Sequence, residues 1–417
     1  MERNEIAHPS EESNAMIPRV CQPKDVMVCI AEEHQVLIVY REKLPGVGSH
    51  YAGLKCNERI YSCVARPYSN LDEAMHTYDL LLSCKHPNLL CPLGLWSCED
   101  KDGSTKTEEE KKEGLKEEEI RAFITFPIFS GALMDIQRDE ILIVEDDSPQ
   151  CQAFGFTHQG SKLFCDIFKF VEFINGLYGA SFPLIPLRIN SNRIVYKKVA
   201  EGQYQVFVWA DFFINLPVHM RRKTKSGKPI DPTVDDIRTA NWNFIGKCLK
   251  DFLKTWDVTP NVELMHLATA LNSKAPNYGD LMWEPGLWSV NIKIHFIREV
   301  YWCIDNQSAR EGLLKSKASL GLEGCILKLR FTLQDENLLD SIMFLRKKIV
   351  AHQDDLYSYG GEKADLGRHN RIIEIEIQKE KPDYMLKLVK ELRQLNWIEI
   401  SPALRSSTAY IEHFKSE

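Results

Sequence analysis

The sequence has no apolar run of about 18 residues, the length that a membrane-spanning helix requires. The segment from Met1 to Glu5 is polar and lacks the apolar core of a secretory signal peptide. The 12 cysteines, scattered from Cys21 to Cys325, include no Cys-x-x-Cys pair, which disfavours a zinc site. We therefore expect reduced thiols, no membrane partner and a cytoplasmic location, with the nucleus as the alternative.

The chain also lacks an excess of positive charge. Its net charge of −7 argues against a surface built for non-specific nucleic-acid binding, and DNA is not an expected partner. A local basic patch is still compatible with this total. The hydrophobic content of 44% and the charged content of 27% are typical of globular proteins. With 417 residues, the chain is long enough for two or three domains.

Local patterns predict a tail followed by strands and one helix. Residues 1–20 are polar and aperiodic, which predicts a disordered tail. The predicted strands are 26–30, 36–40, 61–66, 89–98 and 122–129, with a helix at 70–85. A charged insertion at 99–120 has almost no apolar residues and is predicted to be a disordered surface loop.

The order of these elements resembles that of a protein-kinase small lobe. Phe126-Pro-Ile128 would be the hinge, and the apolar sequence of 167–179 predicts a long helix after it. Strands at 194–196 and 205–209 predict a hairpin that ends in Ala210-Asp-Phe-Phe213. This ending is similar to the Ala-Asp-Phe-Gly segment of kinases, with Phe213 in place of glycine.

Three further segments narrow the resemblance. Cys21-Gln-Pro-Lys-Asp-Val26 is similar to the opening of the inositol-requiring kinase/endoribonuclease family. Glu284-Pro-Gly-Leu-Trp-Ser289 resembles the junction between the kinase and nuclease domains of that family, and Pro382-Asp-Tyr-Met-Leu386 resembles a later segment of the nuclease. From about residue 20 to residue 417, the chain thus resembles this family and ribonuclease L.

The resemblance implies an α+β fold class, with a bilobal protein-kinase-like domain followed by an all-α, HEPN-like ribonuclease domain of the KEN type. The implied small lobe covers 21–129, the large lobe 130–288 and the KEN-like domain 289–417. No sensor or membrane-spanning part is expected. Dimers are the implied assembly, either of two copies or with an active family member.

The positions of a kinase active site are altered. The stretch Cys29–His34, compared with the phosphate-covering loop, has no glycine and contains two acidic residues, which would repel phosphate. Arg66 stands at the position of the strand lysine, and Thr77 stands at that of its partner glutamate. An arginine does not substitute freely for the compact ammonium of lysine.

The remaining kinase positions carry two more arginines. Arg188 stands at the catalytic base and Arg193 at the metal-binding asparagine, while Asp211 matches the magnesium-binding aspartate. Because a guanidinium cannot accept a proton from a substrate hydroxyl, kinase activity is not expected. Arg66 and Asp211 are the candidate cofactor-binding residues and Asp211 is the candidate metal ligand, although ATP, ADP and magnesium binding are disfavoured. The alternative role of Asp211 is that of a turn residue after a buried strand.

The nuclease positions are partly retained. Arg346 matches the catalytic arginine, and Lys347 stands at the asparagine. His352 follows the expected histidine position, Ala351, by one residue, and Leu333 stands at the tyrosine. In the family these residues cleave RNA without a metal, because histidine moves protons and arginine stabilises the phosphorane charge.

The helix that carries these residues has an apolar stripe at Leu338, Ile342, Leu345 and Ile349. Arg346 and His352 lie off this stripe, so the alternative interpretation is a solvated basic face on a core helix. The sequence predicts a pseudokinase scaffold with a KEN-type endoribonuclease that acts on RNA in mRNA processing or a stress response. The alternative is a non-enzymatic regulator that forms heterodimers with an active family member.

Overall fold

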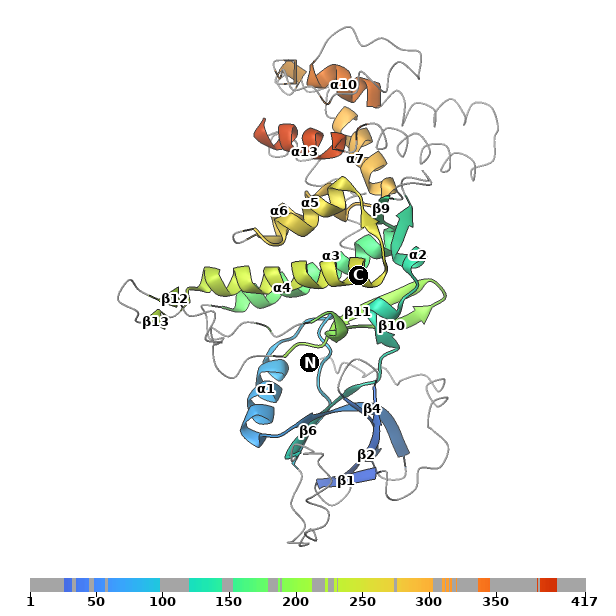
Figure 1. Cartoon of the computed structure of the whole chain (residues 1–417), viewed down its shortest axis with the longest axis vertical. Coiled ribbons are helices and arrows are strands. Elements are labelled where there is room, and N and C mark those ends of the chain that lie inside the picture. The colour runs from blue at the N-terminus through green and yellow to red at the C-terminus, as the bar shows by residue number, and fades with distance from the viewer. Residues whose placement is uncertain are drawn as a thin grey trace, which may run out of the picture. The chain divides into compact units, whose positions relative to one another are not determined.

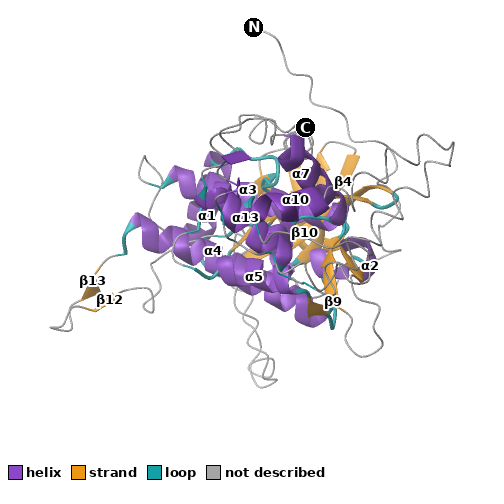
Figure 2. Ribbon diagram, turned by 90° about the horizontal axis from the view of Figure 1, so that it is seen from above, coloured by secondary structure: helices purple, strands orange, loops and turns teal. Residues whose placement is uncertain are grey.

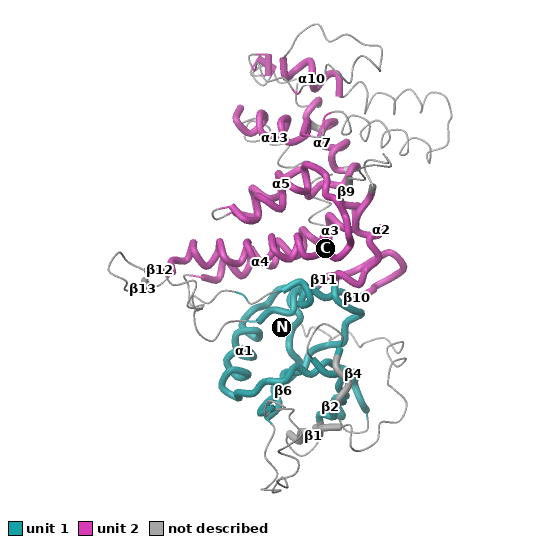
Figure 3. Tube along the Cα trace, in the orientation of Figure 1, with its two compact units in different colours: residues 1–132, 183–197, 207–231 teal, residues 133–182, 198–206, 232–417 magenta. Residues whose placement is uncertain are grey.

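The computed structural model describes residues 26–31, 35–44, 49–56, 59–97, 120–144, 153–178, 187, 190–211, 222–223, 229–230, 232–273, 276–302, 310–311, 313–314, 316, 320, 337–345, 381 and 383–395. The chain divides into two compact units (Figure 3). Unit 1 comprises 1–132, 183–197 and 207–231, and unit 2 comprises 133–182, 198–206 and 232–417. Each unit is described by itself. The architecture mixes helices with a curled antiparallel sheet, as the α+β prediction requires at this coarse level.

Unit 1 is built on a six-stranded antiparallel sheet with the strand order β1-β2-β3-β4-β6-β5 (Figure 1). The strands are β1 (Val26–Ala31), β2 (Gln35–Lys43), β3 (His50–Cys56), β4 (Arg59–Tyr68), β5 (Gly94–Ser97) and β6 (Ala122–Pro127). Alternate residues of these strands form a core cluster of Leu37, Val39, Ala52, Cys63, Ala65, Trp96 and Phe123. Since successive side chains of a strand point to opposite faces, the other residues of β4 belong to a second, separate face.

Helix α1 (Leu71–Ser83) follows β4 directly. The side chain of Asn70 caps it by accepting hydrogen bonds from the backbone N–H groups of Asp72 and Glu73. Ala74, Thr77, Leu80 and Leu81 are its buried residues. This helix contacts β4, β5 and β6, and it agrees with the helix predicted for 70–85.

Strand β3 was not predicted from the sequence. Gly53 and the polar residues His50 and Lys55 weaken the apolar alternation of this segment, yet it pairs along its length with both β2 and β4. The segment between β2 and β3, two strands before Arg66, is therefore 44–49, and its sequence contains Gly46 and Gly48. At its described ends, Leu44 N donates a hydrogen bond of 2.7 Å to Ser49 O. The stretch 29–34, with which the phosphate loop was compared, lies one hairpin earlier.

The rest of unit 1 includes short strands and turns. These are β7 (Gly131–Ala132), η4 (Ser191–Arg193), β12 (Arg222–Lys223) and β13 (Pro229–Ile230). The predicted hairpin is present as β10 (Ile194–Ala200) and β11 (Gln203–Val208), which lead from unit 1 into unit 2 and back. β10 pairs with β7 through Val195 and Tyr196.

Two long helices dominate unit 2. α3 (His158–Leu177) and α4 (Val234–Thr255) lie alongside each other (Figures 1 and 2). Thr233 begins α4 with a capping box, in which its hydroxyl and the carboxylate of Asp236 satisfy each other's backbone N–H groups. Between the helices, buried Asn241 donates to Asn175 Oδ1 at 2.9 Å. The helix predicted for 167–179 corresponds to α3, which begins earlier than predicted, at His158, and ends at Leu177.

Shorter elements complete the first part of unit 2. They are η3 (Leu133–Asp135), α2 (Arg138–Ile141), β8 (Leu142–Val144), β9 (Ala153–Phe156), β14 (Thr259–Pro260), α5 (Val262–Ala270), α6 (Tyr278–Leu281) and η6 (Pro285–Leu287). β14, β9 and β8 form a small sheet in that order. Gly286 packs so closely on α5 that a Cβ atom there would lie 2.2 Å from the Glu263 carbonyl oxygen.

The C-terminal helices of unit 2 are α7 (Val290–Trp302), α10 (Leu338–Leu345) and α13 (Tyr384–Gln394). α7 begins beside an aromatic cluster in which Trp288 packs on Phe296 at a centroid distance of 4.9 Å and Trp283 contacts both. Lys293 of α7 forms a fully buried ion pair with Glu263 of α5 at 2.5 Å. α7 is therefore joined to α5 by packing and by charge.

The structure bears on two sequence-based expectations, one about the cysteine thiols and one about membrane-spanning helices. The cysteines Cys63, Cys84, Cys91, Cys165 and Cys248 are free thiols. Burial raises the pKa of the Cys84 thiol to about 11, so this thiol stays protonated and unreactive at neutral pH. Within the described ranges, no helix has the length and apolar character to cross a membrane.

Candidate functional site

Arg66 lies on the face of β4 that points away from the core cluster of the sheet. Cys63 and Ala65 belong to that cluster, so the alternation of the strand places Arg66 and Tyr68 together on the opposite side. The Arg66 guanidinium carbon lies 4.9 Å from the centre of the Tyr68 ring, within the range of a cation–π contact. Only 11% of the Arg66 side chain is exposed.

Asp211 is held in place by the segment that follows β11. Val208 donates to Asn88 O at 2.7 Å and its carbonyl accepts from Leu90 N at 3.1 Å, which joins this segment to the chain after α1. Trp209 donates its backbone N–H to Arg193 O at 2.8 Å. Its buried ring packs edge-on against Phe126 of β6 at a centroid distance of 5.0 Å. Because these contacts hold Trp209 in place, Asp211, two residues later, is held in place as well.

The carboxylate of Asp211 binds two arginines. Its Oδ2 atom accepts a hydrogen bond from Arg66 and another from Arg193 Nη1, the latter at 2.9 Å. The Asp211 side chain is 1% exposed and that of Arg193 is 17% exposed. The arginine cluster, which we define as Arg66, Arg193 and Asp211, is thus a buried group with one net positive charge.

Each ionisable group of the arginine cluster responds to the others. Burial alone would raise the pKa of the Asp211 carboxyl, but the two guanidinium groups hold it below its usual value. For Arg66, burial opposes the charged form, but the Asp211 carboxylate more than compensates and raises its pKa. Burial and the nearby charge of Arg66 lower the pKa of Arg193. The carboxylate is therefore ionised at neutral pH.

Burial also raises the pKa of the Tyr68 phenol, so Tyr68 is neutral at physiological pH. The Tyr68 hydroxyl, the Nη1 atom of Arg66 and the hydroxyl of Thr77 on α1 are buried, and none of them has a hydrogen-bond partner among the residues that the structure describes. The sequence comparison aligned Thr77 with the kinase glutamate. Thr77 carries no charge, and Arg66 forms its ion pair with Asp211, while Glu73 of α1 makes a smaller contribution that also raises the pKa of Arg66.

The arginine cluster does not fit a divalent cation. A magnesium ion is held by carboxylate and other oxygen ligands, whereas two guanidinium groups already lie at the Asp211 carboxylate oxygen and would repel the ion. Arg193 stands at the position where the resemblance implies a metal-binding asparagine. Its guanidinium places a second positive charge beside Asp211.

The candidate nuclease residues Arg346, Lys347 and His352 lie outside the described residues, as does Arg188. α10 is described as far as Leu345, and within it Leu338, Ile342 and Leu345 are buried as the apolar stripe predicts. Of the candidate site residues, the structure thus brings together Arg66 and Asp211. Within the described ranges, no group of three histidine, cysteine or acidic side chains is placed to hold a metal ion.

The sequence comparison aligns Arg193 and Asp211 with two metal-binding positions of kinases, but it does not predict the ion pair between them. Oppositely charged residues at two such positions are the signal that could have revealed it. The roles of Tyr68 and of the Glu263–Lys293 pair were also missed, because contacts between distant elements leave no local pattern in the sequence.

Comparison with known proteins leaves the family open. No family model matches the chain, and no curated protein matches its sequence.

Proposed function

We propose that the protein is a catalytically inactive kinase-like scaffold that carries a KEN-type domain acting on RNA. The observation that carries the first half of this proposal is the arginine cluster, in which the candidate cofactor-binding residue Arg66 reaches Asp211 across 145 residues of sequence. In the kinase resemblance, the corresponding strand residue and aspartate both face the nucleotide phosphates. Here the two residues are paired with each other and with Arg193.

The strand order supports the same proposal. A helix, α1, lies between β4 and β5, and a hairpin, β10–β11, leads to Asp211, which is the order expected of a bilobal kinase-like fold. Counting strands back from Arg66, we compare 44–49, whose sequence contains Gly46 and Gly48, with the phosphate-covering loop of kinases. The loop alone does not restore catalysis, because Arg188 cannot act as a base.

In this proposal, the arginine cluster stabilises the folded scaffold and does not serve to bind a nucleotide. Two arginines neutralise a carboxylate that would otherwise be a buried, uncompensated charge. The segment after β11 is in this way tied to the central sheet of unit 1. A fixed segment of this kind suits a domain that assembles with another chain, as the family resemblance implies.

The RNA-directed half of the proposal rests on the sequence resemblance at Arg346, Lys347 and His352. The described helices α7, α10 and α13 are consistent with an all-α domain in the C-terminal part. Arginine and histidine supply phosphate stabilisation and proton transfer, the two requirements of cleavage by the RNA 2′-hydroxyl. No metal is needed for this chemistry.

Phosphotransfer is tested with the purified full chain, radiolabelled ATP and a generic protein substrate. We expect no transfer above that of heat-inactivated protein. Transfer that persists in the Asp211→Asn variant would come from a contaminant, whereas transfer that this variant abolishes would refute the scaffold proposal.

Cleavage is tested with structured and single-stranded RNAs at protein concentrations that cover the monomer–dimer range. We expect cleavage that survives chelation of metals and falls by about 10²–10³ in Arg346→Ala, because the variant loses charge stabilisation of the transition state. The matched control is Arg59→Ala at the exposed start of β4, which also removes an arginine. RNA left intact at all concentrations would exclude the nuclease.

The second candidate function, a regulator that pairs with an active family member, is favoured by the replacements Leu333 and Lys347 at two catalytic positions. It predicts that rising amounts of this chain change the cleavage rate of an active partner in the same tube. An unchanged rate at every ratio would exclude it.

A further inference from the structure

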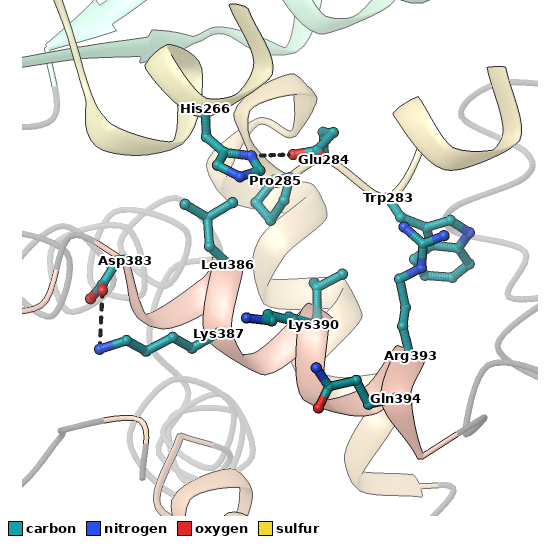
Figure 4. A pocket seen from close by; sticks show the side chains of 11 residues that line it. His266, Trp283, Glu284, Pro285, Asp383, Leu386, Lys387, Lys390, Arg393 and Gln394 are labelled. Atoms are coloured by element: carbon teal, nitrogen blue, oxygen red, sulfur yellow. Dashed lines mark hydrogen bonds and ion pairs between the residues drawn. The ribbon is translucent and has the colours of Figure 1, made fainter. Parts of the chain in front are cut away.

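Unit 2 contains a pocket with a volume of about 420 Å³, a size typical of small-molecule sites. Helix α13 forms one side, and α5 with the segment Trp283–Pro285 forms the other (Figure 4). The lining residues are His266, Trp283, Glu284, Pro285, Asp383, Leu386, Lys387, Val389, Lys390, Arg393 and Gln394. None of them belongs to the arginine cluster or to the candidate nuclease residues.

The acidic groups of the pocket are paired with basic neighbours. Glu284 Oε2 lies 2.7 Å from His266 Nδ1, and Asp383 Oδ2 lies 3.0 Å from Lys387 Nζ. Arg393 is paired with Asp280, which does not line the pocket. Lys390 is exposed and makes no ion pair with any residue that the structure describes, so its ammonium is the charge left to meet an anion.

The aromatic side of the pocket is rigid. Trp283 is only partly exposed, and its ring packs edge-on against Trp288 at 6.4 Å and against Phe296 at 6.2 Å. These two contacts fix the indole plane, while the side chain also lines the pocket. A held indole is a platform on which a nucleobase can stack. Leu386 and Val389 of α13 add apolar wall.

We propose that this pocket binds one nucleotide unit, with the base against Trp283 and the phosphate at Lys390. An aromatic surface and a cation within one pocket match the two parts of a nucleotide, and stacking with phosphate contacts is the general mode by which single strands bind. The choice of a nucleotide over other aromatic anions rests on the proposed RNA-directed function. The inference adds to that function a binding subsite separate from the catalytic positions.

The same chemistry is present in a free nucleotide and in single-stranded RNA, so both are used as probes. Binding to the full chain is measured by anisotropy with a short labelled single-stranded RNA, and by competition with a nucleoside monophosphate. Tighter binding of RNA assigns the pocket to a strand, and equal binding assigns it to the free nucleotide. Polyglutamate serves as a competitor that offers negative charge without a base.

Three variants test the residues. Lys390→Glu should weaken RNA binding about tenfold or more, and Trp283→Leu by about fivefold to a hundredfold, the range of lost stacking. Trp283→Phe should retain most of the affinity. The matched control is Lys250→Glu, which makes the same charge change at an exposed position on α4. Thermal melting establishes that each variant is folded.

Several outcomes would overturn the inference. They are equal weakening by Lys390→Glu and Lys250→Glu, equal competition by polyglutamate and nucleotide, and no binding of either probe. Failure of the proposed nuclease is distinguishable from these results. If RNA binds with the expected variant pattern but stays intact, the nuclease proposal fails and the pocket stands. If RNA is cleaved and the pocket variants leave binding and KM unchanged, the pocket inference fails alone.

Discussion

The ammonium of Lys293 and the carboxylate of Glu263 lie 2.5 Å apart, and neither side chain is exposed to solvent. The pair joins α7 to α5 next to the close packing of Gly286 on Glu263. Two opposite charges buried in contact stabilise each other, but each is a strong liability without its partner. This relationship makes the start of α7 a sensitive region of unit 2.

Removal of one member of that pair is expected to destabilise the protein strongly. Lys293→Met leaves Glu263 as a buried charge, which should lower the free energy of unfolding by about 3–5 kcal/mol. Urea denaturation followed by circular dichroism measures the loss. The double variant Lys293→Met with Glu263→Leu should recover most of it, and a double variant as unstable as the single one would contradict this account.

The arginine cluster predicts an acid-sensitive contribution to stability. Because the folded-state pKa of Asp211 is lowered, its contribution is fully present above the unfolded pKa of about 3.9 and is lost as the pH falls through the folded pKa. Asp211→Asn should remove this acid limb and, at neutral pH, lower stability by about 3–5 kcal/mol, since two buried guanidinium groups lose their counter-charge. Melting temperatures from acidic to neutral pH provide the measurement.

The control for this variant is Asp235→Asn on α4, whose side chain is 75% exposed. It makes the same chemical change at a solvated position and should leave the pH dependence nearly unchanged. An acid limb of equal size in wild type and Asp211→Asn would show that other carboxyl groups control it.

His266, which lines the pocket of unit 2, is expected to have a raised pKa. The hydrogen bond that His266 donates to Glu284 raises the pKa of His266, so the contribution of this pair is fully present below about pH 6.5 and is lost as the pH rises through the folded pKa. Titration of the imidazole by NMR should show a lower pKa for His266 in Glu284→Gln. His158, whose pKa is lowered by burial, should titrate unchanged in the same spectra. A His266 titration that is indifferent to the substitution would rule out the pair.

Substitution by alanine is expected to change stability in opposite directions at two glycines, Gly286 and Gly176. At Gly286 the added methyl group would lie 2.2 Å from a backbone oxygen that cannot move cheaply, so Gly286→Ala should destabilise unit 2. At Gly176, within α3, nothing lies within 4 Å of the added Cβ, and Gly176→Ala should stabilise by about 0.5–1 kcal/mol. Thermal melting of the two variants side by side tests this contrast. Similar shifts in the same direction would disprove the packing argument.

Local patterns were sufficient to predict much of unit 1. Strands β1, β2, β4 and β6, helix α1 and the β10–β11 hairpin all lie where the sequence indicates, because apolar alternation and the cap at Asn70 are encoded locally. β3 was missed because the partners on both sides stabilise it more than its own alternation does. With β3 present, the segment two strands before Arg66 is 44–49 and not 29–34.

The candidate site could be predicted only in part, and from motif order instead of local patterns. Arg66 and Asp211 were selected by their positions in a motif order, which carries no information about what each side chain contacts. The second cation, Arg193, reaches the carboxylate through a turn that only tertiary structure defines. The pocket of unit 2 was not predictable, since α13 is distant in the sequence from α5 and the segment at Trp283 that it faces.

The shared carboxylate of the arginine cluster also limits which substitutions are open to the chain over evolution. Exchange of Arg66 for lysine leaves Arg193 in the way of a metal, and exchange of Arg193 for asparagine removes one of two counter-charges from a buried acid. Each single step lowers stability before any new chemistry arises. The three positions of the arginine cluster are therefore expected to change together in evolution and not one at a time.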